Sequence, residues 1–398
     1  MSLRIGILGT RGIPNHYGGF EQLTEYLAPG LVQAGHDVTV YNSHNHPYKE
    51  HEWRGVHIRH CYDPEHWMGC AGQFVYDLNC LLDARKRGFD VILQLGYTSS
   101  SVWWPLFPPG SLIIYNLDGL EWRRSKYSPM TRRFLRYAEK LAVKHSDSTI
   151  ADSPVIQSYF REKYGIESEY IPYGAELFDH TDETPLQEYG LHPGEYFLLM
   201  SRMEPENNIE VILEGFCNSQ SARKFLVVGN MSNRYGQHLV ARFGHDKRVF
   251  FPGPIYDRQR IHCLKFFSRL YFHGHSTGGT NPSLLEAMAS QALIAAHDNT
   301  FNREVLGGGA FYFSSSAEIT VLVEKTGERE MENPAPGRGK MRGAICGREE
   351  EQMIRLNLNR ISERFNWPSV ISRYEWFILY SLFIFNNERN ILYRRYSC

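Results

Sequence analysis

The first 41 residues hold the pattern that most constrains the fold of this chain. Arg4–Leu8 reads as a short buried strand, and Asp37–Tyr41 reads as a second strand. Between them lie a glycine-rich stretch and a segment, Glu21–Ala34, whose apolar residues recur at helical spacing. Continuous apolar strands on either side of a helix are typical of a parallel βαβ unit, in which both faces of the sheet are covered. The sequence therefore predicts that the chain opens with a doubly wound α/β domain.

This opening unit does not fit a dinucleotide site. Its glycines are spaced as Gly9-x-x-Gly12 and then as the pair Gly18-Gly19, whereas a dinucleotide site uses G-x-G-x-x-G. The second strand also runs into an Asn-Ser pair, without an acid to hold a ribose 2′-hydroxyl. The sequence thus argues against NAD or FAD, and we expect no cofactor.

A second glycine-rich stretch, residues 271–290, leads directly into a predicted helix. Asn281 is a favourable N-cap residue, and Pro282 suits the first helical position. A loop followed by a helix start presents backbone N–H groups and the positive end of the helix dipole to an anion, most often a phosphate. Glu286, one turn into the helix, is suited to accept hydrogen bonds from the paired hydroxyls of a sugar. The pattern indicates a nucleotide-sugar site, and the alternative is a capped helix that follows a surface turn.

The alternation of strands and helices is interrupted by one polar segment and resumes at a new strand, Tyr196–Met200. A terminal helical pattern covers roughly residues 351–385, and residues 327–350 are charged and rich in Gly and Pro, as in an insert. The predicted division is an N-terminal Rossmann-like domain at 1–174, a linker at 175–193, a second α/β domain at 194–365, and a helix or tail at 366–398 that packs back on the first domain.

Polar residues follow the predicted strand Ser111–Tyr115. Open α/β sheets keep their sites just beyond the carboxyl ends of strands, so Asp118 and Glu121 are candidate functional residues. The alternative is that Asp118 belongs to a turn and that Glu121 is an acid at a helix start.

A basic stretch from Arg123 to Lys144 is interleaved with aromatic residues and includes Arg132, Arg133 and Arg136. It is either a solvated helix face or a helix that rests on an anionic membrane surface. No apolar run reaches the roughly 18–20 residues that a membrane span needs.

The overall composition limits the remaining classes of function. The 398 residues carry a formal net charge of −1, so no global field attracts nucleic acid. Seven scattered cysteines without a C-x-x-C pair favour a reducing compartment and argue against a zinc site. The N-terminus runs straight into a strand, and we expect no signal peptide.

Three motifs carry a resemblance to a known family: GTRGIPNHYGGFE at 9–21, NLDGLEWRRSK at 116–126 and HGHSTGGTNPSLLEAMA at 273–289. With two tandem doubly wound domains, the chain resembles the GT-B glycosyltransferases. The closer resemblance is to glycosyltransferase family 4, and within it to bacterial rhamnosyltransferases of capsule and exopolysaccharide synthesis. It extends from residue 3 to about residue 315.

The resemblance assigns roles to individual residues. Glu286 corresponds to the glutamate that holds the nucleotide ribose, and Arg202 to the arginine that binds the donor diphosphate. Gly18 and Gly19 correspond to the glycine pair that lets the N-domain loop approach the phosphates. The remaining candidate donor-binding residues are Asn207, Gly278, Gly279, Thr280 and Asn281.

Three positions depart from the family pattern. Gly278 stands where the family usually has a first glutamate, and Asn207 stands where it has a lysine. The diphosphate would then depend on Arg202 and on backbone amides of the loop. Leu117 or Asp118, depending on the alignment, replaces a histidine that contacts the 6-hydroxyl of the sugar. A 6-deoxy sugar such as rhamnose has no such hydroxyl, so this loss fits.

The resemblance implies a retaining, metal-independent transfer of L-rhamnose from dTDP-rhamnose to a lipid-linked saccharide. The enzyme would be cytoplasmic and peripheral at the inner face of the cytoplasmic membrane. Asp118 and His275 are the titratable groups expected nearest the reaction. The alternatives are a nucleotide-sugar epimerase of the same fold and an inactive protein that binds sugar nucleotides.

Overall fold

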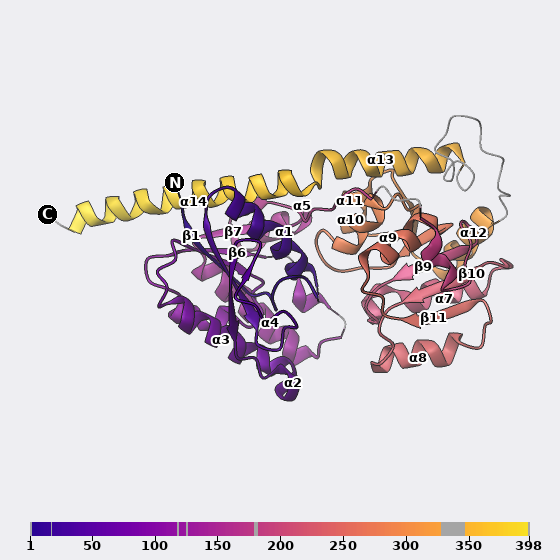
Figure 1. Cartoon of the computed structure of the whole chain (residues 1–398), viewed down its shortest axis with the longest axis horizontal. Helices are drawn as coiled ribbons and strands as arrows, with labels where there is room; N and C mark the ends of the chain where they lie inside the picture. The colour runs from indigo at the N-terminus through magenta and orange to yellow at the C-terminus, as the bar shows by residue number, and fades with distance from the viewer. Residues whose placement is uncertain are drawn as a thin grey trace. The chain divides into compact units, whose positions relative to one another are not determined.

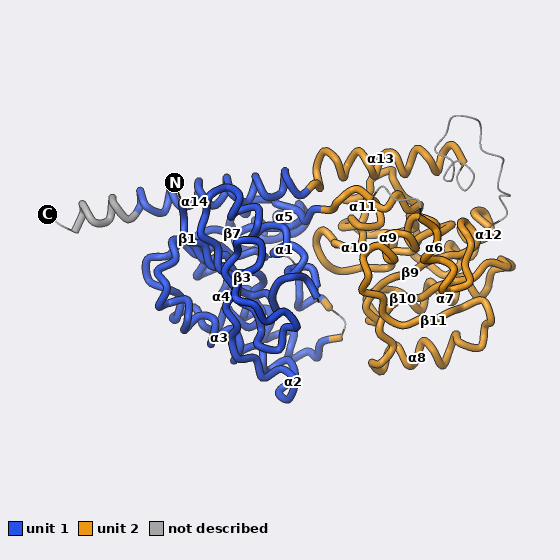
Figure 2. Tube along the Cα trace, in the orientation of Figure 1, with its two compact units in different colours: residues 1–123, 127–174, 367–398 blue, residues 124–126, 175–366 orange. Residues whose placement is uncertain are grey.

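The computed structural model describes residues 2–16, 18–117, 119–124, 126–178, 182–327 and 347–396, with side chains up to Glu388. The candidate Asp118 and most of the predicted insert at 327–350 lie outside these ranges. The chain divides into two compact units (Figure 2). Unit 1 comprises Met1–Arg123, Tyr127–Gly174 and Trp367–Cys398, and unit 2 comprises Arg124–Lys126 and Ala175–Asn366.

Unit 1 is built on an eight-stranded sheet in the order β3-β4-β2-β1-β5-β6-β7-β8. All neighbouring strands pair in parallel except β3 and β4. β1 lies at the centre, with Ile5 opposite both Val38 and Val91. The strands are β1 (Arg4–Leu8), β2 (Asp37–Ser43), β3 (Glu52–Trp53), β4 (Val56–Cys61), β5 (Val91–Leu95), β6 (Leu112–Asn116), β7 (Ser148–Ala151) and β8 (Glu169–Tyr170).

The helices of unit 1 follow the strands in the alternation that the sequence predicts (Figure 1). The first turn after β1 leads into α1 (Gly19–Gln33), which packs beside β2. The others are α2 (Glu65–Met68), η1 (Gly69–Ala71), α3 (Gly72–Ala84), η2 (Ser101–Leu106), η3 (Glu121–Arg123), α4 (Pro129–His145), α5 (Pro154–Tyr164) and α14 (Trp367–Tyr396).

Unit 2 has a six-stranded parallel sheet in the order β11-β10-β9-β12-β13-β14. Phe197, Phe216, Phe225 and Phe272 form an aromatic cluster in its core, with ring centroids 4.9 to 6.2 Å apart. The strands are β9 (Tyr196–Met200), β10 (Lys224–Val228), β11 (Val249–Gly253), β12 (Leu270–His273), β13 (Ile294–His297) and β14 (Phe311–Phe313). The helices are α6 (Thr184–Gln187), η4 (Pro205–Asn207), α7 (Ile209–Cys217), α8 (Arg234–Phe243), α9 (Arg258–Phe267), α10 (Pro282–Ala289), α11 (Thr300–Leu306), α12 (Ser316–Gly327) and α13 (Arg348–Arg364).

The terminal helical pattern forms two helices rather than one. α13 ends at Arg364 in unit 2, and α14 begins at Trp367 in unit 1. The break precedes Pro368, which suits the first turn of a helix but not its interior. α14 then packs along α1 (Figure 1), where Trp367 stacks on Tyr26 with ring centroids 4.3 Å apart.

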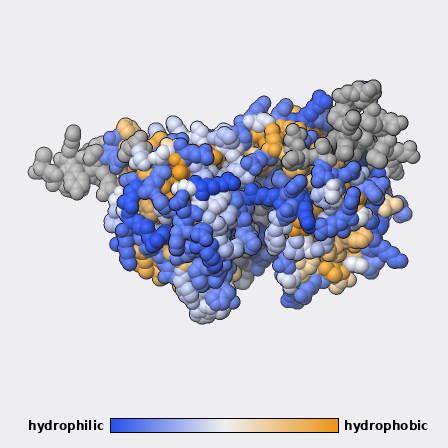
Figure 3. Space-filling model, in the orientation of Figure 1, coloured by the Kyte–Doolittle hydropathy of each residue, from blue (hydrophilic) through white to orange (hydrophobic). Residues whose placement is uncertain are grey.

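Within the described residues, no helix is both long and apolar enough to cross a bilayer. Most of the face shown in Figure 3 is hydrophilic, with hydrophobic residues scattered over it.

Candidate active site

The glycine-rich loop of unit 2 follows β12 and ends at α10, as the sequence predicts. The Asn281 side chain caps the helix, because its Oδ1 accepts hydrogen bonds from the Ser283 backbone N–H at 3.0 Å and from the Ser283 hydroxyl at 2.9 Å. Gly278 has a φ of +126°, which L side chains rarely adopt, although a Cβ there would meet open space. Gly278 stands where the family that the sequence resembles has a glutamate, and the backbone at this position has a conformation that favours glycine.

Side chains and backbone from neighbouring loops hold this loop in place. The backbone N–H and the hydroxyl of Ser276 both donate to the Glu206 carbonyl, at 3.1 and 2.8 Å. The Asn208 amide donates to the Gly274 carbonyl at 2.7 Å, and the amides of Asn299 and Asn302 each donate to the His275 carbonyl at 3.0 Å. The loop is thus fixed to the segments that follow β9 and β13.

The segment after β9 carries the predicted diphosphate residues. Arg202 is exposed, whereas Asn207 is buried and donates from its side-chain amide to the Arg202 carbonyl at 2.7 Å. Gly274 must be glycine here, since a Cβ would lie 2.0 Å from the Asn207 carbonyl oxygen. Asn207 therefore supports the backbone that presents Arg202. Of the other loop candidates, Gly279 is partly exposed and Thr280 is buried.

Two histidines of the loop stack on each other. The rings of His273 and His275 lie 4.4 Å apart at an angle of 12°. Neither ring nitrogen of His273, nor Nδ1 of His275, has a hydrogen-bond partner among the residues that the structure describes. Burial, followed by the charges of Arg202 and Arg124, lowers the pKa of His275 to about 3, and burial also lowers the pKa of His273. Both rings are neutral near pH 7, so His275 is suited to hydrogen bonding rather than to donating a proton as an imidazolium.

Glu286 lies on α10 with its side chain 29% exposed. Its Oε2 accepts a hydrogen bond from Lys265 Nζ at 2.8 Å, and the Lys265 side chain is 1% exposed. Sequence reasoning missed Lys265, although the position gives a signal. It stands between Leu264 and Phe266 in an apolar stretch of α9, and a buried lysine requires an acidic partner.

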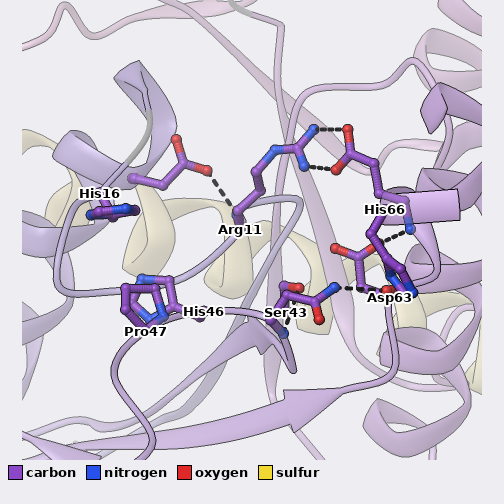
Figure 4. Close-up of a pocket in the computed structure, with 10 residues that line it drawn as sticks. Arg11, His16, Ser43, His46, Pro47, Asp63 and His66 are labelled. Atoms are coloured by element: carbon purple, nitrogen blue, oxygen red, sulfur yellow. Dashed lines mark hydrogen bonds and ion pairs between the residues drawn. The ribbon is translucent and has the colours of Figure 1, made fainter. Parts of the chain in front are cut away.

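A second candidate region is a cavity of about 340 Å³ in unit 1, beyond the carboxyl ends of β1, β2 and β4. In Figure 4, Arg11 points toward the segment that carries Asp63 and His66. The guanidinium of Arg11 forms a two-point ion pair with Glu65, of which the Nη2–Oε1 distance is 2.9 Å. The lining residues are Arg11, His16, Glu21, Ser43, Asn45, His46, Pro47, Asp63, Glu65 and His66.

Buried carboxylates organise this cavity. Glu21 Oε1 accepts hydrogen bonds from the Arg11 backbone N–H at 2.7 Å and from the Thr10 hydroxyl at 3.2 Å. Asp63 is 3% exposed, and its Oδ1 accepts from the Glu65 backbone N–H at 3.0 Å. Glu21 lies in the first turn of α1, whereas Asp63 lies in the loop after β4, far away in the sequence. Their common position after parallel strands is the signal that could have identified them.

The glycine pair lies at the start of α1, next to the cavity. Gly18 is the N-cap residue, and Gly19 opens the helix. A Cβ on Gly18 would approach Oε2 of Glu21, which lines the cavity, to 3.1 Å.

The remaining predicted residues belong to η3 and α4. Glu121 begins η3 and is partly exposed, and the indole N–H of the adjacent Trp122 donates to the buried Glu139 at 3.0 Å. On α4, Arg132 is partly buried, whereas Arg133 and Arg136 are exposed. The Arg136 guanidinium lies 4.6 Å from the Trp122 ring centroid.

Two Rossmann-like units with parallel sheets, each carrying a glycine-rich loop before a helix, define the GT-B fold. Solved structures of other proteins share this two-unit fold. The chain is similar to a sucrose-phosphate synthase from Thermosynechococcus elongatus, with 15% identity, a TM-score of 0.76, and coverage of 94% of this chain and 98% of that one. It is also similar to HepE from Anabaena in complex with UDP-glucose, with 16% identity, a TM-score of 0.70, and coverage of 95% and 98%.

A third similar structure is the catalytic domain of Starch Synthase IV from Arabidopsis thaliana bound to ADP and acarbose, with 12% identity, a TM-score of 0.69, and coverage of 96% and 100%. At these identities the likeness establishes the shared fold. Residues 109–176 match a family model described as a domain of unknown function (DUF1972). The comparison with curated proteins gave no match.

Proposed function

We propose that this protein is a glycosyltransferase that moves a sugar from a nucleoside diphosphate to a saccharide acceptor. The observation that carries the proposal is the site in unit 2, where the capped N-terminus of α10 and the exposed Arg202 can hold a diphosphate. Glu286, on the same helix, supplies a carboxylate for the hydroxyls of the nucleoside. The complexes of structurally similar proteins with UDP-glucose and with ADP support this assignment.

The proposed donor is dTDP-L-rhamnose. The three sequence motifs resemble those of bacterial rhamnosyltransferases. Leu117, one of the two positions that align with the histidine for the 6-hydroxyl, is an apolar residue with no exposed surface. Leu117 therefore offers no polar partner to a 6-hydroxyl, which is compatible with a 6-deoxy sugar.

The proposed reaction proceeds with retention and relies on electrostatic stabilisation. Arg202 and the amides at the start of α10 stabilise the charge that develops on the leaving diphosphate. The neutral imidazole of His275 donates a hydrogen bond to the nucleotide-sugar or accepts one from it, and the charge of the ring does not change. The acceptor hydroxyl attacks from the face that the diphosphate leaves.

The cavity in unit 1 is the proposed site for the acceptor saccharide. Its volume lies within the roughly 300–1,000 Å³ of small-molecule sites. Glu21, Asp63 and Glu65 give it a carboxylate-rich lining, and its arginine is already paired with Glu65. Such a lining suits the hydroxyl groups of a saccharide.

The acceptor is proposed to be lipid-linked, with α4 resting on an anionic membrane at the cytoplasmic face. Five residues of α4, spaced three and four positions apart on one helical face, are exposed. They combine cations with a methionine and a tyrosine that are 84% and 56% exposed. We call them the α4 face: Met130, Arg133, Tyr137, Lys140 and Lys144.

The test is to incubate the full chain with nucleotide-sugars, with and without a lipid-linked saccharide. Sugar transfer that requires both substrates supports the proposal. Conversion of the donor without acceptor would show an epimerase instead. Nucleotide binding without any turnover would show a binding protein.

A further inference from the structure

The outer face of α14 is apolar and exposed to solvent. Five of its large residues are exposed, and four of them lie three, four, seven and eight positions after the first, which places all five on one helical face. Trp376 and Phe383 are 57% and 66% exposed. We call this set the α14 patch: Trp376, Leu379, Tyr380, Phe383 and Ile384.

The opposite face of the same helical turns is also apolar, and it is buried. Phe377, Ile378 and Leu382 are buried on this side, where α14 packs on α1 and β6. A helix that is apolar on all sides is typical of one that is buried on all sides, whereas a surface helix carries polar residues on its outer face. The α14 patch therefore indicates a surface that a partner covers.

The helix that carries the patch is fixed to unit 1. Beyond the stacking of Trp367 on Tyr26, the Asn116 side-chain amide donates to the Tyr374 hydroxyl at 2.7 Å. Within the patch, the rings of Trp376 and Tyr380 stack with centroids 5.1 Å apart at an angle of 7°. The apolar surface is thus preorganised, which lowers the entropic cost of binding a partner.

Two consecutive residues of β6 show which side of the sheet α14 covers. Tyr115 points toward η2, because its ring centroid lies 5.9 Å from that of Phe107, the residue that ends η2, and η2 packs on α4. Asn116 points to the other side, toward Tyr374 of α14, since consecutive side chains of a strand alternate between the two faces. α14 and α4 therefore cover opposite faces of the unit 1 sheet. A bilayer that contacts the α4 face does not reach the α14 patch.

Opposite charges lie at the two ends of the patch. Arg373, one turn before it, has a side chain that is 35% exposed, and Glu388, one turn after it, is exposed. The Arg373 guanidinium donates to the Tyr170 carbonyl and lies 3.9 Å from Glu169, and its five N–H donors can serve a further carboxylate as well. A surface with a cation at one end and an acid at the other is self-complementary when a second copy lies antiparallel to it.

We propose that the α14 patch is the interface of a homodimer whose two α14 helices pack antiparallel about a twofold axis. An axis through the middle of the patch brings Trp376 of each protomer against Phe383 of the other, and it directs each Arg373 toward the Glu388 of the other. A parallel arrangement would bring like charges together. The inference goes beyond the proposed function, on which only the exclusion of a bilayer depends.

The first experiment measures the mass of the full chain by sedimentation equilibrium over a concentration series, without substrates. Because one helix per protomer gives a small interface, we expect a dimer of two 46.1 kDa chains with a dissociation constant of about 1–50 µM. A wild-type protein that stays monomeric up to about 200 µM would overturn the inference.

Phe383→Glu tests the patch, and Val321→Glu is its matched control. Phe383→Glu places a charge in the interface and removes an aromatic contact, so it should raise the dissociation constant of the dimer roughly thirtyfold or more. Val321, on α12, is 62% exposed, so its replacement makes the same charge change at a similarly exposed apolar residue and should leave the dimer intact. Equal effects of the two variants, or none from Phe383→Glu, would contradict the inference.

A mixing experiment tests the antiparallel arrangement. Trp376→Lys and Phe383→Glu should each be monomeric alone. Mixed in equal amounts they should associate, because the introduced lysine of one protomer faces the introduced glutamate of the other, while the native Phe383 and Trp376 meet at the second contact. A mixture that remains monomeric would refute this arrangement.

A lipid bilayer is the alternative cover of the patch, and vesicles distinguish it from a second copy. The wild-type protein should not float with neutral phosphatidylcholine vesicles, and Phe383→Glu should float with anionic vesicles as well as the wild-type protein does. Flotation of the wild-type protein that Phe383→Glu abolishes, with either kind of vesicle, would show that a bilayer covers the patch and would overturn the inference. Absence of sugar transfer by a dimeric wild-type protein would instead refute the proposed function and leave the dimer standing.

Discussion

At the scale of single residues, Glu286 is the most consequential side chain of the proposed donor site. Glu286→Ala should weaken nucleotide binding by roughly ten- to a hundredfold, as expected for the loss of about 1.5–3 kcal/mol of hydrogen bonding to a charged group. The same change removes the carboxylate that pairs with the buried ammonium of Lys265, so it should also lower the melting temperature.

A double variant separates these two effects. Glu286→Ala combined with Lys265→Met should recover the melting temperature, because no buried charge remains, but it should not recover nucleotide affinity. Calorimetry and thermal melting measure the two quantities independently. An unchanged nucleotide Kd in a folded Glu286→Ala protein would leave Glu286 as an ordinary helix residue.

Asp77 on α3 makes a prediction about pH. It is 7% exposed, and burial raises its pKa to about 7 although the Ser99 hydroxyl donates to it at 2.6 Å. A carboxyl with a raised pKa stabilises the fold fully below its unfolded pKa, and that stability is lost as pH rises through about 7. Asp77→Asn should therefore melt at an increasingly higher temperature than the wild-type protein as pH rises from 5 to 8.

Asp246 is the matched control for this measurement. Arg248 lowers the pKa of Asp246 to about 2, so its charge is constant between pH 5 and 8 in the folded and unfolded chain alike. Asp246→Asn should be less stable than the wild-type protein by the same margin at both pH values. A melting difference for Asp77→Asn that is also independent of pH would show that Asp77 does not titrate in this range.

At the scale of elements, the cavity of unit 1 predicts an effect on the acceptor alone. Glu65→Gln removes one charge from the lining and loosens Arg11. It should raise the KM for the acceptor saccharide several-fold and leave the Kd for the nucleotide unchanged, since Arg202, Glu286 and the start of α10, which are proposed to hold the nucleotide, belong to unit 2. Steady-state kinetics with a saturating donor measure the first quantity. An equal effect on both substrates would argue against an acceptor site here.

The α4 face predicts reversible binding to anionic liposomes. Each Lys or Arg near an anionic surface contributes about 1 kcal/mol, so charge reversal of Arg133, Lys140 and Lys144 should abolish flotation. Arg132 and Arg136 are poorer choices than the sequence suggested, because one is partly buried and the other lies on the Trp122 ring. High salt should release the wild-type protein.

Charge reversal at Arg54, Lys86 and Lys247, which are exposed elsewhere, is the control for the liposome experiment. This variant has the same net charge as the α4 variant and should still float with anionic vesicles. Failure of the wild-type protein to float with anionic lipid at low salt would refute the membrane role of α4.

Helix starts that neighbouring residues determine were predictable from the sequence, whereas side-chain contacts between different helices were not. Asn281 and Pro282 mark the start of α10 because capping depends on the neighbouring residues alone, and the structure confirms that helix start. The pairing of Lys265 with Glu286 depends on how α9 packs beside α10, which no local pattern encodes. The break between α13 and α14 has a local signal in Pro368, but helical periodicity on both sides obscured it.

At the scale of the whole molecule, the two-unit GT-B architecture was predictable because strands and helices alternate twice along the chain. The same architecture serves many donors, so donor identity depends on particular residues of the site. We expect calorimetry to show tighter binding of dTDP-rhamnose than of UDP-glucose or UDP-GlcNAc. A clear preference for either UDP-sugar would exclude rhamnose as the natural donor.

The last prediction concerns metal ions. The part of the chain that the structure describes places no group of three or more His, Cys, Asp or Glu residues where they could bind a metal. In the proposed mechanism, Arg202 and the amides at the α10 N-terminus supply the positive charge that faces the diphosphate. Transfer by the full chain should therefore proceed at the same initial rate with and without EDTA, and Arg202→Ala should lower that rate in both conditions. Loss of activity in EDTA that Mg²⁺ or Mn²⁺ restores would show instead that a cation shares the charge of the leaving group.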